Sequence, residues 1–341
     1  MLWCFAATDK ARLPSAYGEE VFLSELVVVT VPLPDDVLDV LAAKFDLQVW
    51  RESSQIPEEV LKEWVAHARG LLCSVGTPVT RGVIESAPGL KMISTISVGV
   101  DHIDVSHAAK RGIPVGYTPD ILVDSTADMA LALMLAVTRR VPEADQLIRN
   151  GGWQAGWSTG FFLGTDLSRA TVGVVGLGPI GQAVARRLRG FGSRVLGWNR
   201  TPREVEGVEL VELDTLFSSA DVVTVHTAAT PETHHLVNAQ RLASMQDGAI
   251  LINTARGAIV DESALISELS SGRLRAGLDV FADEPLPQDS PLTHLKNVVL
   301  TPHLGSATAA TRRAMVERAL ENLFAGMAGH PPPWGLEVSA Q

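Results

Sequence analysis

Short apolar runs and helix-period segments alternate along most of this chain. The runs are rich in Val, Ile and Leu and are bounded by Gly, Pro or Asp, as buried strands usually are. Between the runs, apolar residues recur every three or four positions, which is typical of one face of a helix. This alternation predicts an α/β fold in which helices cover both faces of parallel sheets.

The pattern also places the individual elements. Strands are expected at residues 26–31, 47–50, 70–74, 92–96, 172–175, 195–198, 208–211, 221–224, 249–253, 276–280 and 298–300. Helices are expected at residues 35–45, 57–68, 81–86, 125–141, 182–188, 214–218, 262–271 and 312–327, with another around Leu242 and Met245. Asp124 or Ser125 is a candidate N-cap for the helix at 125–141. The helical pattern resumes at Glu143 in spite of Pro142.

Residues 171–201 have the clearest local meaning. An apolar strand ends in three glycines at the spacing Gly176, Gly178 and Gly181, and a helix and a second strand follow. In this context the spacing is a dinucleotide-binding fingerprint. Gly176 permits a tight turn, Gly178 lets a pyrophosphate approach the backbone, and Gly181 lets the helix pack close to the strand. Pro179 falls in the first helical turn, where its missing N–H costs nothing.

The end of the second strand indicates which dinucleotide binds. An NAD site usually places Asp or Glu there for the ribose 2′-hydroxyl. This chain instead has Asn199, Arg200, Thr201 and, after a proline, Arg203. A neutral residue removes the repulsion that a 2′-phosphate would meet, and an arginine can donate two parallel hydrogen bonds to it. We therefore expect NADPH as the preferred cofactor, with NADH possible, unless the arginines are solvated loop charges.

Composition and charge narrow the class of protein. A length of 341 residues suggests two domains. The net charge of -11 argues against nucleic acid and anionic membranes as partners. Cys4 and Cys73 are the two cysteines, and no apolar run is long enough to span a bilayer, so we expect a cytoplasmic protein without disulfides. Residues 1–24 are expected to form an extension, to which the pattern assigns no role.

Three ionisable residues follow predicted strands in the second half of the chain. They are Arg256, Glu284 and His303. Parallel strands end at one edge of a sheet, so these side chains are expected to converge beside a bound nicotinamide. Their chemistry suits hydride transfer to a 2-oxo acid. An arginine grips the carboxylate and polarises the carbonyl, a histidine donates the proton, and a glutamate orients the histidine and favours its charged form. The alternative is that each is an ordinary loop residue.

Two loops after strands of the first half are candidates for completing a carboxylate site. Backbone N–H groups near Val75–Gly76 and Val98–Gly99 are suited to bind a carboxylate at the carboxyl ends of the strands. A structural alternative stays open, in which Gly99 merely turns the chain and Asp101 or Asp104 caps the next helix. No histidine or cysteine spacing is typical of a zinc site, so the expected chemistry uses no metal.

The tract at residues 150–168 is unusual because four aromatic residues lie among glycines without a clear period. An exposed aromatic patch of this kind usually marks a surface that binds a partner. We therefore expect this tract to form an oligomer contact.

Several motifs together resemble those of the D-isomer-specific 2-hydroxyacid dehydrogenases, namely GLGPIG, NTARGAIVDE, GLDVFADEPLP and TPHLGSAT. The resemblance runs from about residue 26 to residue 328, and within the family KMISTISVGVDHID and RNGGWQAGW are most similar to glyoxylate and hydroxypyruvate reductases. It implies a Rossmann domain at 122–306 inserted in a flavodoxin-like substrate domain at 25–121 plus 307–341. Both domains would be doubly wound parallel sheets with a cleft between them. It also implies a homodimer, with residues 140–168 as the dimerisation arm.

The resemblance assigns roles to single residues. Arg256, Glu284 and His303 would be catalytic. The substrate site would contain Val75, Gly76, Val98, Gly99, Arg256, His303, Ser306 and, from the neighbouring subunit, Trp157 or alternatively Trp153. The cofactor site would contain Thr126, Gly176, Gly178, Pro179, Ile180, Gly181, Asn199, Arg200, Thr201, Arg203, Thr227, Ala228, Thr254, Asp279, His303 and Gly305.

The implied activity is the reduction of short 2-oxo acids, glyoxylate to glycolate and hydroxypyruvate to D-glycerate. Formate dehydrogenases of this type pair the histidine with glutamine, whereas this chain has Glu284. D-lactate relatives often carry aromatic residues near the carboxylate loop, whereas CSVGTP is small. The alternatives are another dehydrogenase of the family, a phosphite or formate oxidiser, or a nucleotide-sensing corepressor that uses the same fold to bind partners.

Overall fold

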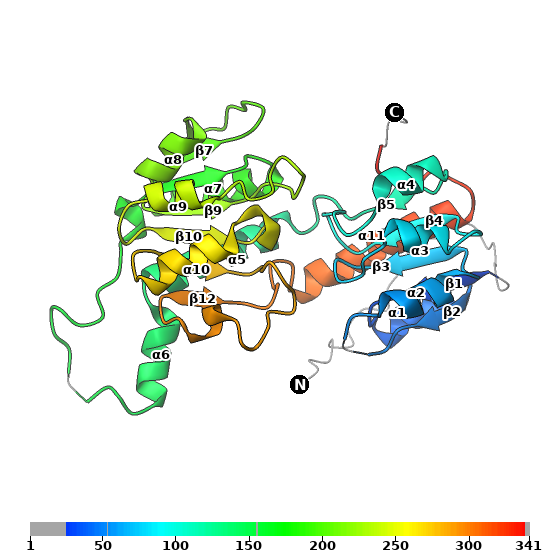
Figure 1. Ribbon diagram of the computed structural model, residues 1–341, viewed down its shortest axis with the longest axis horizontal. Helices are drawn as coiled ribbons and strands as arrows, with labels where there is room; N and C mark the ends of the chain where they lie inside the picture. The colour runs from blue at the N-terminus through cyan, green and yellow to red at the C-terminus, as the bar shows by residue number, and fades with distance from the viewer. Residues whose placement is uncertain (1–24, 53, 155, 338–341) are drawn as a thin grey trace. The chain divides into compact units, whose positions relative to one another are not determined.

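The computed structural model describes residues 25–52, 54–154 and 156–337. These residues form two compact units (Figure 1). The first unit takes its residues from Met1–Ile121 and Thr308–Gln341, and the second is Leu122–Ala307. The predicted extension at residues 1–24 lies outside the described residues.

The first unit is a five-stranded parallel sheet in the order β2-β1-β3-β4-β5, which is the flavodoxin-like order. Its strands are β1 (Leu26–Val29), β2 (Asp46–Val49), β3 (Gly70–Cys73), β4 (Met92–Thr95) and β5 (Val115–Gly116). Its helices are α1 (Asp35–Ala42), α2 (Glu58–Val65), α3 (Arg81–Glu85), α4 (Val105–Lys110) and α11 (Ala309–Met327). Helices α2, α3 and α4 bury their apolar residues against one face of this sheet.

Helix α11 comes from the C-terminal part of the chain and packs on β3, β4 and β5 of the first sheet. Asn322 is completely buried there, and its side chain donates to Tyr117 O and accepts from Trp334 N, both at 2.9 Å. Ser94 Oγ donates to Ala319 O at 2.7 Å. The two ends of the described chain therefore share one unit.

The second unit is a seven-stranded sheet in the order β12-β11-β10-β9-β6-β7-β8, and all of its strand pairs are parallel. Its strands are β6 (Thr171–Val175), β7 (Arg194–Trp198), β8 (Glu209–Leu210), β9 (Val222–Val225), β10 (Ile250–Asn253), β11 (Arg275–Leu278) and β12 (Val298–Leu300). Counted from β6, this is the Rossmann order with one further strand. The predicted fold class is therefore confirmed.

Helices cover both faces of the second sheet (Figure 1). They are α5 (Val123–Thr138), α7 (Pro179–Phe191), α8 (Leu213–Ser219), α9 (Ala239–Ser244) and α10 (Glu262–Ser270), whereas α6 (Val141–Arg149) covers neither face. One apolar core joins the sheet to α8, α9 and α10, and a second joins it to α5 and α7. Among the described residues, no helix is both long enough and apolar enough to cross a membrane.

The predicted helix at 125–141 was wrong at both ends. Helix α5 begins at Val123, so Asp124 and Ser125 lie inside its first turn and neither caps it, and Ser125 Oγ donates to Leu122 O at 3.1 Å. The chain then breaks at Arg140, which has a φ of 55° in the left-handed region. Helix α6 starts directly after it, with a proline in the first turn, where no N–H is needed.

The aromatic tract and α6 extend away from the second sheet (Figure 1). Helix α6 has no buried residue. Ile148 is 60% exposed, Trp153 55% and Trp157 85%. Large apolar side chains this exposed and this close together in the sequence are typical of a surface that binds a partner.

Candidate active site

The glycine turn of the second unit requires glycine for two different reasons. Gly176 follows β6 with a φ of 99°, which L side chains rarely adopt, and a Cβ there would lie 2.7 Å from His226 O. A Cβ on Gly181 in α7 would lie 1.9 Å from Gly176 O. Both residues therefore let α7 start directly against the end of β6, with Pro179 and Ile180 in its first turn.

Gly178 behaves differently, because a Cβ on it would meet no protein atom within 4 Å. Nothing in the described protein requires glycine at this N-cap position, so the small residue suits the close approach of a phosphate to the backbone. Two buried hydroxyls, Thr227 Oγ1 and Thr254 Oγ1, have no hydrogen-bond partner among the described residues. They follow β9 and β10, whose carboxyl ends lie at the same sheet edge as the glycine turn. Open backbone and unpartnered hydroxyls fit a dinucleotide.

The residues after β7 form an exposed turn whose first member is hydrogen-bonded. Asn199 Oδ1 accepts from Leu177 N at 3.0 Å, and its Nδ2 donates to Thr201 O at 2.7 Å. Arg200, Thr201 and Arg203 are exposed. The neutral amide therefore links the glycine turn to the end of β7, and the exposed arginines follow it directly.

Arg256 lies in a turn that Asn253 fixes at the carboxyl end of β10. Asn253 is 1% exposed, its Oδ1 accepts from Ala255 N at 3.0 Å, and its Nδ2 donates to Arg256 O at 2.9 Å. Asn253 was not among the site residues predicted from the sequence, although an asparagine at a strand end commonly hydrogen-bonds to the backbone that follows it. The guanidinium of Arg256 donates to Ala255 O at 2.9 Å.

Glu284 and His303 form a pair. His303 Nδ1 lies 2.7 Å from Glu284 Oε2, and Glu284 Oε1 accepts from Phe281 N at 3.1 Å. Burial acts to raise the pKa of Glu284, but the hydrogen bond and charge of His303, the N–H of Phe281 and the charge of Arg256 outweigh it. The pKa of Glu284 therefore lies below its ordinary value, and the carboxylate is ionised at neutral pH.

Asp279 holds the loop that carries His303. It is 1% exposed, and its Oδ1 accepts from Thr301 Oγ1 at 2.5 Å and from Leu304 N at 2.7 Å. Its Oδ2 accepts from Gly305 N at 2.8 Å. His303 itself has a φ of 54°, which is unusual for a residue with a side chain. Three hydrogen bonds to one carboxylate stabilise this backbone. Thr301, which donates one of them, was not among the site residues predicted from the sequence.

The remaining predicted residues of the second unit lie as follows. A Cβ on Gly305 would be 3.4 Å from both Asp279 Oδ2 and Thr126 Cγ2, so these three residues lie together. Ser306 follows Gly305 in the same loop, and Ala228 O accepts from Thr233 Oγ1 at 2.7 Å in the loop after β9. Trp153 and Trp157 lie on the exposed tract beyond α6.

The two predicted carboxylate loops belong to the first unit. Val75–Gly76 follows β3 and Val98–Gly99 follows β4, both at the carboxyl edge of the sheet. Among the described residues, the amide N–H groups of Gly76, Val98 and Gly99 donate to no protein acceptor. Asp104 caps α4 by accepting from His107 N at 2.9 Å, as the structural alternative expected, whereas Asp101 is not the cap.

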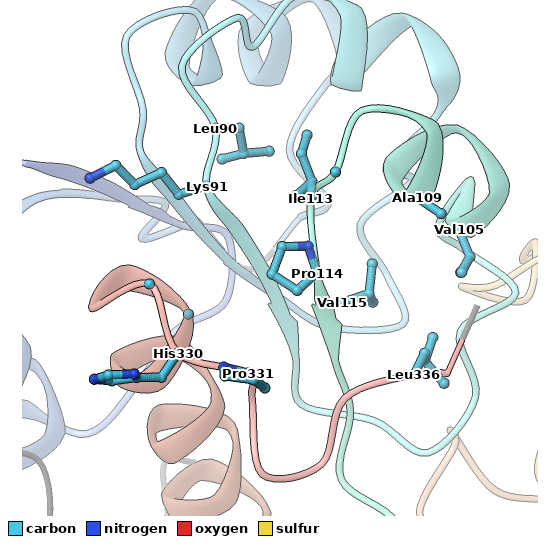
Figure 2. A pocket seen from close by; sticks show the side chains of 13 residues that line it. Leu90, Lys91, Val105, Ala109, Ile113, Pro114, Val115, His330, Pro331 and Leu336 are labelled. Carbon is cyan, nitrogen blue, oxygen red and sulfur yellow. The ribbon is translucent and has the colours of Figure 1, made fainter. Parts of the chain in front are cut away.

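A pocket of about 670 Å³ lies near the amino ends of strands β4 and β5 in the first sheet (Figure 2). It is lined by Lys91 before β4, Pro114 before β5 and His330 after α11, among others. The carboxylate loops follow the opposite ends of the strands, so this pocket is no part of the predicted substrate site. Throughout the described ranges, His, Cys, Asp and Glu side chains nowhere gather in groups of three that could hold a metal ion.

Comparison with known proteins agrees with this geometry. The D-isomer specific 2-hydroxyacid dehydrogenase, NAD binding domain, matches residues 131–305. Human glyoxylate reductase/hydroxypyruvate reductase is 42% identical over 92% of this chain and 98% of its own. A crystal structure of a Thermus thermophilus protein is 47% identical, with a TM-score of 0.86 over 91% of this chain and 99% of its own.

A further solved structure shows a relative with ligands. It is the NADPH-dependent glyoxylate/hydroxypyruvate reductase of Sinorhizobium meliloti in complex with NADP and malonate. It is 33% identical, with a TM-score of 0.82 over 92% of this chain and 97% of that one. With identities above 30% over nine-tenths of its length, the chain belongs to the D-isomer specific 2-hydroxyacid dehydrogenase family.

Proposed function

We propose that this protein reduces short 2-oxo acids with NADPH, converting glyoxylate to glycolate and hydroxypyruvate to D-glycerate. The observation that carries the proposal is the 2.7 Å pair of His303 and Glu284 on a loop neighbouring Arg256. A positioned proton donor next to a carboxylate-binding cation is what the reduction of a 2-oxo acid requires. The names of the human and Sinorhizobium meliloti relatives support these substrates.

The mechanism assigns one task to each of these side chains. When bound, the reduced nicotinamide supplies the hydride that the carbonyl carbon of the substrate takes up. Arg256 binds the substrate carboxylate and polarises the carbonyl. His303 gives its proton to the carbonyl oxygen as negative charge develops there, so the product is a neutral hydroxyl. Nδ1 is engaged by Glu284, which leaves Nε2 as the nitrogen that donates.

The residues of the glycine turn would hold the cofactor. Gly178, Pro179 and Ile180 offer backbone and a helix N-terminus to the pyrophosphate. Thr126, Asp279 and Gly305 would lie at the nicotinamide, with the hydroxyls of Thr227 and Thr254 beside it. In the first unit, the free N–H groups of Gly76, Val98 and Gly99 would bind the substrate carboxylate.

The preference for NADPH rests on the turn after β7. Its first residue is the amide Asn199, not a carboxylate, so a 2′-phosphate meets no negative charge there. Arg200 and Arg203 are exposed and supply positive charge. The Sinorhizobium meliloti relative is described as NADPH-dependent, which supports the same preference. NADH remains the second cofactor that the proposal allows.

We also propose a cytoplasmic homodimer that forms through α6 and the tract that follows it. The exposed Ile148, Trp153 and Trp157 support this, because exposed large apolar side chains gain free energy when a second copy covers them. In this dimer Trp157, or Trp153, would reach the substrate pocket of the neighbouring subunit.

A matrix of substrates and cofactors tests the proposal. Initial rates are measured with glyoxylate, hydroxypyruvate, pyruvate and formate, each with NADPH or NADP and with NADH or NAD. We expect turnover of the first two with NADPH, and we expect Arg200→Ala to lower the ratio of kcat/KM for NADPH to that for NADH. His303→Ala should cut kcat by roughly 10²- to 10⁴-fold. An enzyme that reduces none of these 2-oxo acids would refute the proposal, and an unmoved cofactor ratio would refute the role of Arg200.

A further inference from the structure

The loop after β4 contains a chain of side-chain hydrogen bonds that ends on a backbone carbonyl. Ser97 Oγ donates to Gly99 O at 2.7 Å. Thr95 Oγ1 lies 2.7 Å from Ser97 Oγ, and His102 Nε2 lies 3.0 Å from Thr95 Oγ1. Thr95 is completely buried and Ser97 is 3% exposed, so water does not replace these contacts.

The direction of each hydrogen bond follows from counting hydrogens. A carbonyl oxygen only accepts, so the single hydroxyl hydrogen of Ser97 is used on Gly99 O. Ser97 can then only accept from Thr95, whose own hydrogen is used in turn. Thr95 Oγ1 must therefore accept from His102, which requires a hydrogen on Nε2. The Cys73 thiol also contacts Thr95. Thr95 nevertheless donates its hydrogen to Ser97, because sulfur is the weaker acceptor and two oxygens 2.7 Å apart would repel each other without a hydrogen between them.

The backbone of His102 also contacts the chain that follows the second carboxylate loop. Its backbone oxygen accepts from Val79 N at 2.8 Å, just after the Val75–Gly76 loop. Val79 O in turn accepts from Asp104 N at 3.0 Å. His102 is thus linked to the Val98–Gly99 loop through Thr95 and Ser97, and to the chain just after the Val75–Gly76 loop through its backbone oxygen.

We propose that His102, with a hydrogen on Nε2, is a positioning residue. Through Thr95 and Ser97 it orients the Val98–Gly99 loop, so that the N–H groups of this loop can bind the carboxylate of the substrate. This inference rests on the proposed function, because it takes a 2-oxo acid as the ligand of that loop. The hydrogen bond from Ser97 holds the Gly99 carbonyl against buried groups. A carbonyl oxygen that turned outward would instead repel a carboxylate beside the same N–H groups.

The test compares variants along the chain with a matched control. Ser97→Ala and Thr95→Val each remove one hydroxyl, His102→Ala removes the donor, and His102→Gln keeps an N–H of similar reach. We expect the first three to raise the KM for glyoxylate about tenfold, with kcat and the KM for NADPH changed much less. His102→Gln should restore most of the affinity. His107→Gln, on α4 and outside the chain of hydrogen bonds, should leave all these constants unchanged.

The tautomer of the His102 ring is a second readout, and it does not depend on activity. Nitrogen-15 NMR of the unaltered protein should show the Nε2–H tautomer for this residue. The Nδ1–H tautomer, or unchanged glyoxylate KM values in Ser97→Ala and Thr95→Val, would overturn the inference while the proposed function stands. A protein that reduces no short 2-oxo acid would overturn the proposed function and this inference with it.

Discussion

A Cβ atom on Gly257 would lie 1.9 Å from the carbonyl oxygen of Phe281. The loop that carries Arg256 therefore approaches the loop that carries Glu284 as closely as two backbones can. Phe281 also donates its N–H to Glu284 Oε1 at 3.1 Å. Close packing, not an unusual backbone conformation, is the reason for glycine at position 257, and it places two candidate catalytic residues next to each other.

Gly257→Ala should separate these loops and lower activity. The added methyl must displace backbone atoms, because no flexible side chain is there to give way. We expect kcat/KM for glyoxylate to fall by at least about tenfold, which corresponds to about 1.4 kcal/mol of lost transition-state stabilisation. Steady-state kinetics measures this change. Gly190→Ala in α7 is the matched control, since its Cβ would meet nothing within 4 Å, and it should leave kcat/KM unchanged. Equal kinetics in both variants would contradict the argument.

Asp279→Asn should impair His303 although the two side chains do not form a hydrogen bond with each other in the described structure. The carboxylate accepts from Leu304 N, Gly305 N and Thr301 Oγ1, and an amide group would turn a donor toward one of these hydrogens. The left-handed backbone of His303 then loses its support. We expect kcat to fall by about 10- to 100-fold. Asp289→Asn, at an exposed position on the same stretch of chain, should behave as the unaltered enzyme. A normal kcat in Asp279→Asn would show that the loop carrying His303 keeps its conformation without the Asp279 carboxylate.

Acid should destabilise the second unit through His226. Burial of its ring lowers the pKa of His226 to about 3, although the residue as a whole is not completely covered. The unfolded chain takes up a proton near pH 6.5 and the folded chain does not, so stability is complete above that pH. Stability is then lost as the pH falls toward 3, by on the order of 1 kcal/mol per pH unit.

Thermal unfolding at pH 7 and pH 5 measures this contribution. We expect the melting temperature of His226→Gln to fall less between the two pH values than that of the unaltered protein. His294→Gln, at an exposed position, should show the full decrease. If His226→Gln and His294→Gln respond alike, the folded protein binds a proton at His226 and the ring is not sheltered as described.

Glu284 should add to the loss of stability at lower pH. Its pKa is lowered in the folded protein, where the contacts with His303, Phe281 and Arg256 outweigh the effect of burial. The stability that the ionised carboxylate contributes is complete above the ordinary carboxyl pKa of about 4.3 and is lost as the pH falls through the lowered value. Glu284→Gln should therefore flatten the melting-temperature profile below about pH 4.3 only. A flattening that begins near pH 6 would contradict this assignment.

A charge on α6 should disrupt the proposed homodimer. Ile148 is 60% exposed in the single chain, and an aspartate in a covered apolar surface would be desolvated without a partner. Sedimentation analysis is expected to find a dimer for the unaltered protein and a monomer for Ile148→Asp. Phe191→Asp alters another exposed apolar residue, at the end of α7, and should remain dimeric. If sedimentation gives Ile148→Asp and Phe191→Asp the same oligomeric mass, α6 is not the dimer contact.

Local pattern predicted most of the elements because burial on a sheet or helix face imposes a period on the residues themselves. The strands at 70–74 and 92–96 were each one residue too long, and the strand at 298–300 agreed with β12. The helix at 125–141 failed because the break at Arg140 has no local signature. An arginine in the left-handed region is held by surrounding structure, not by its own preference.

The sequence by itself determined which side chains were available for the chemistry and which strand each one follows. It predicted the different roles of Gly176 and Gly181, because turn and packing constraints act over only a few residues. Only the tertiary structure decided that Asp279 binds the loop of His303 and that the backbone at Gly257 lies against that at Phe281. These relationships join residues on different loops, and a shift of a few tenths of an ångström would change them. The order of residues along the chain does not show which distant loops meet.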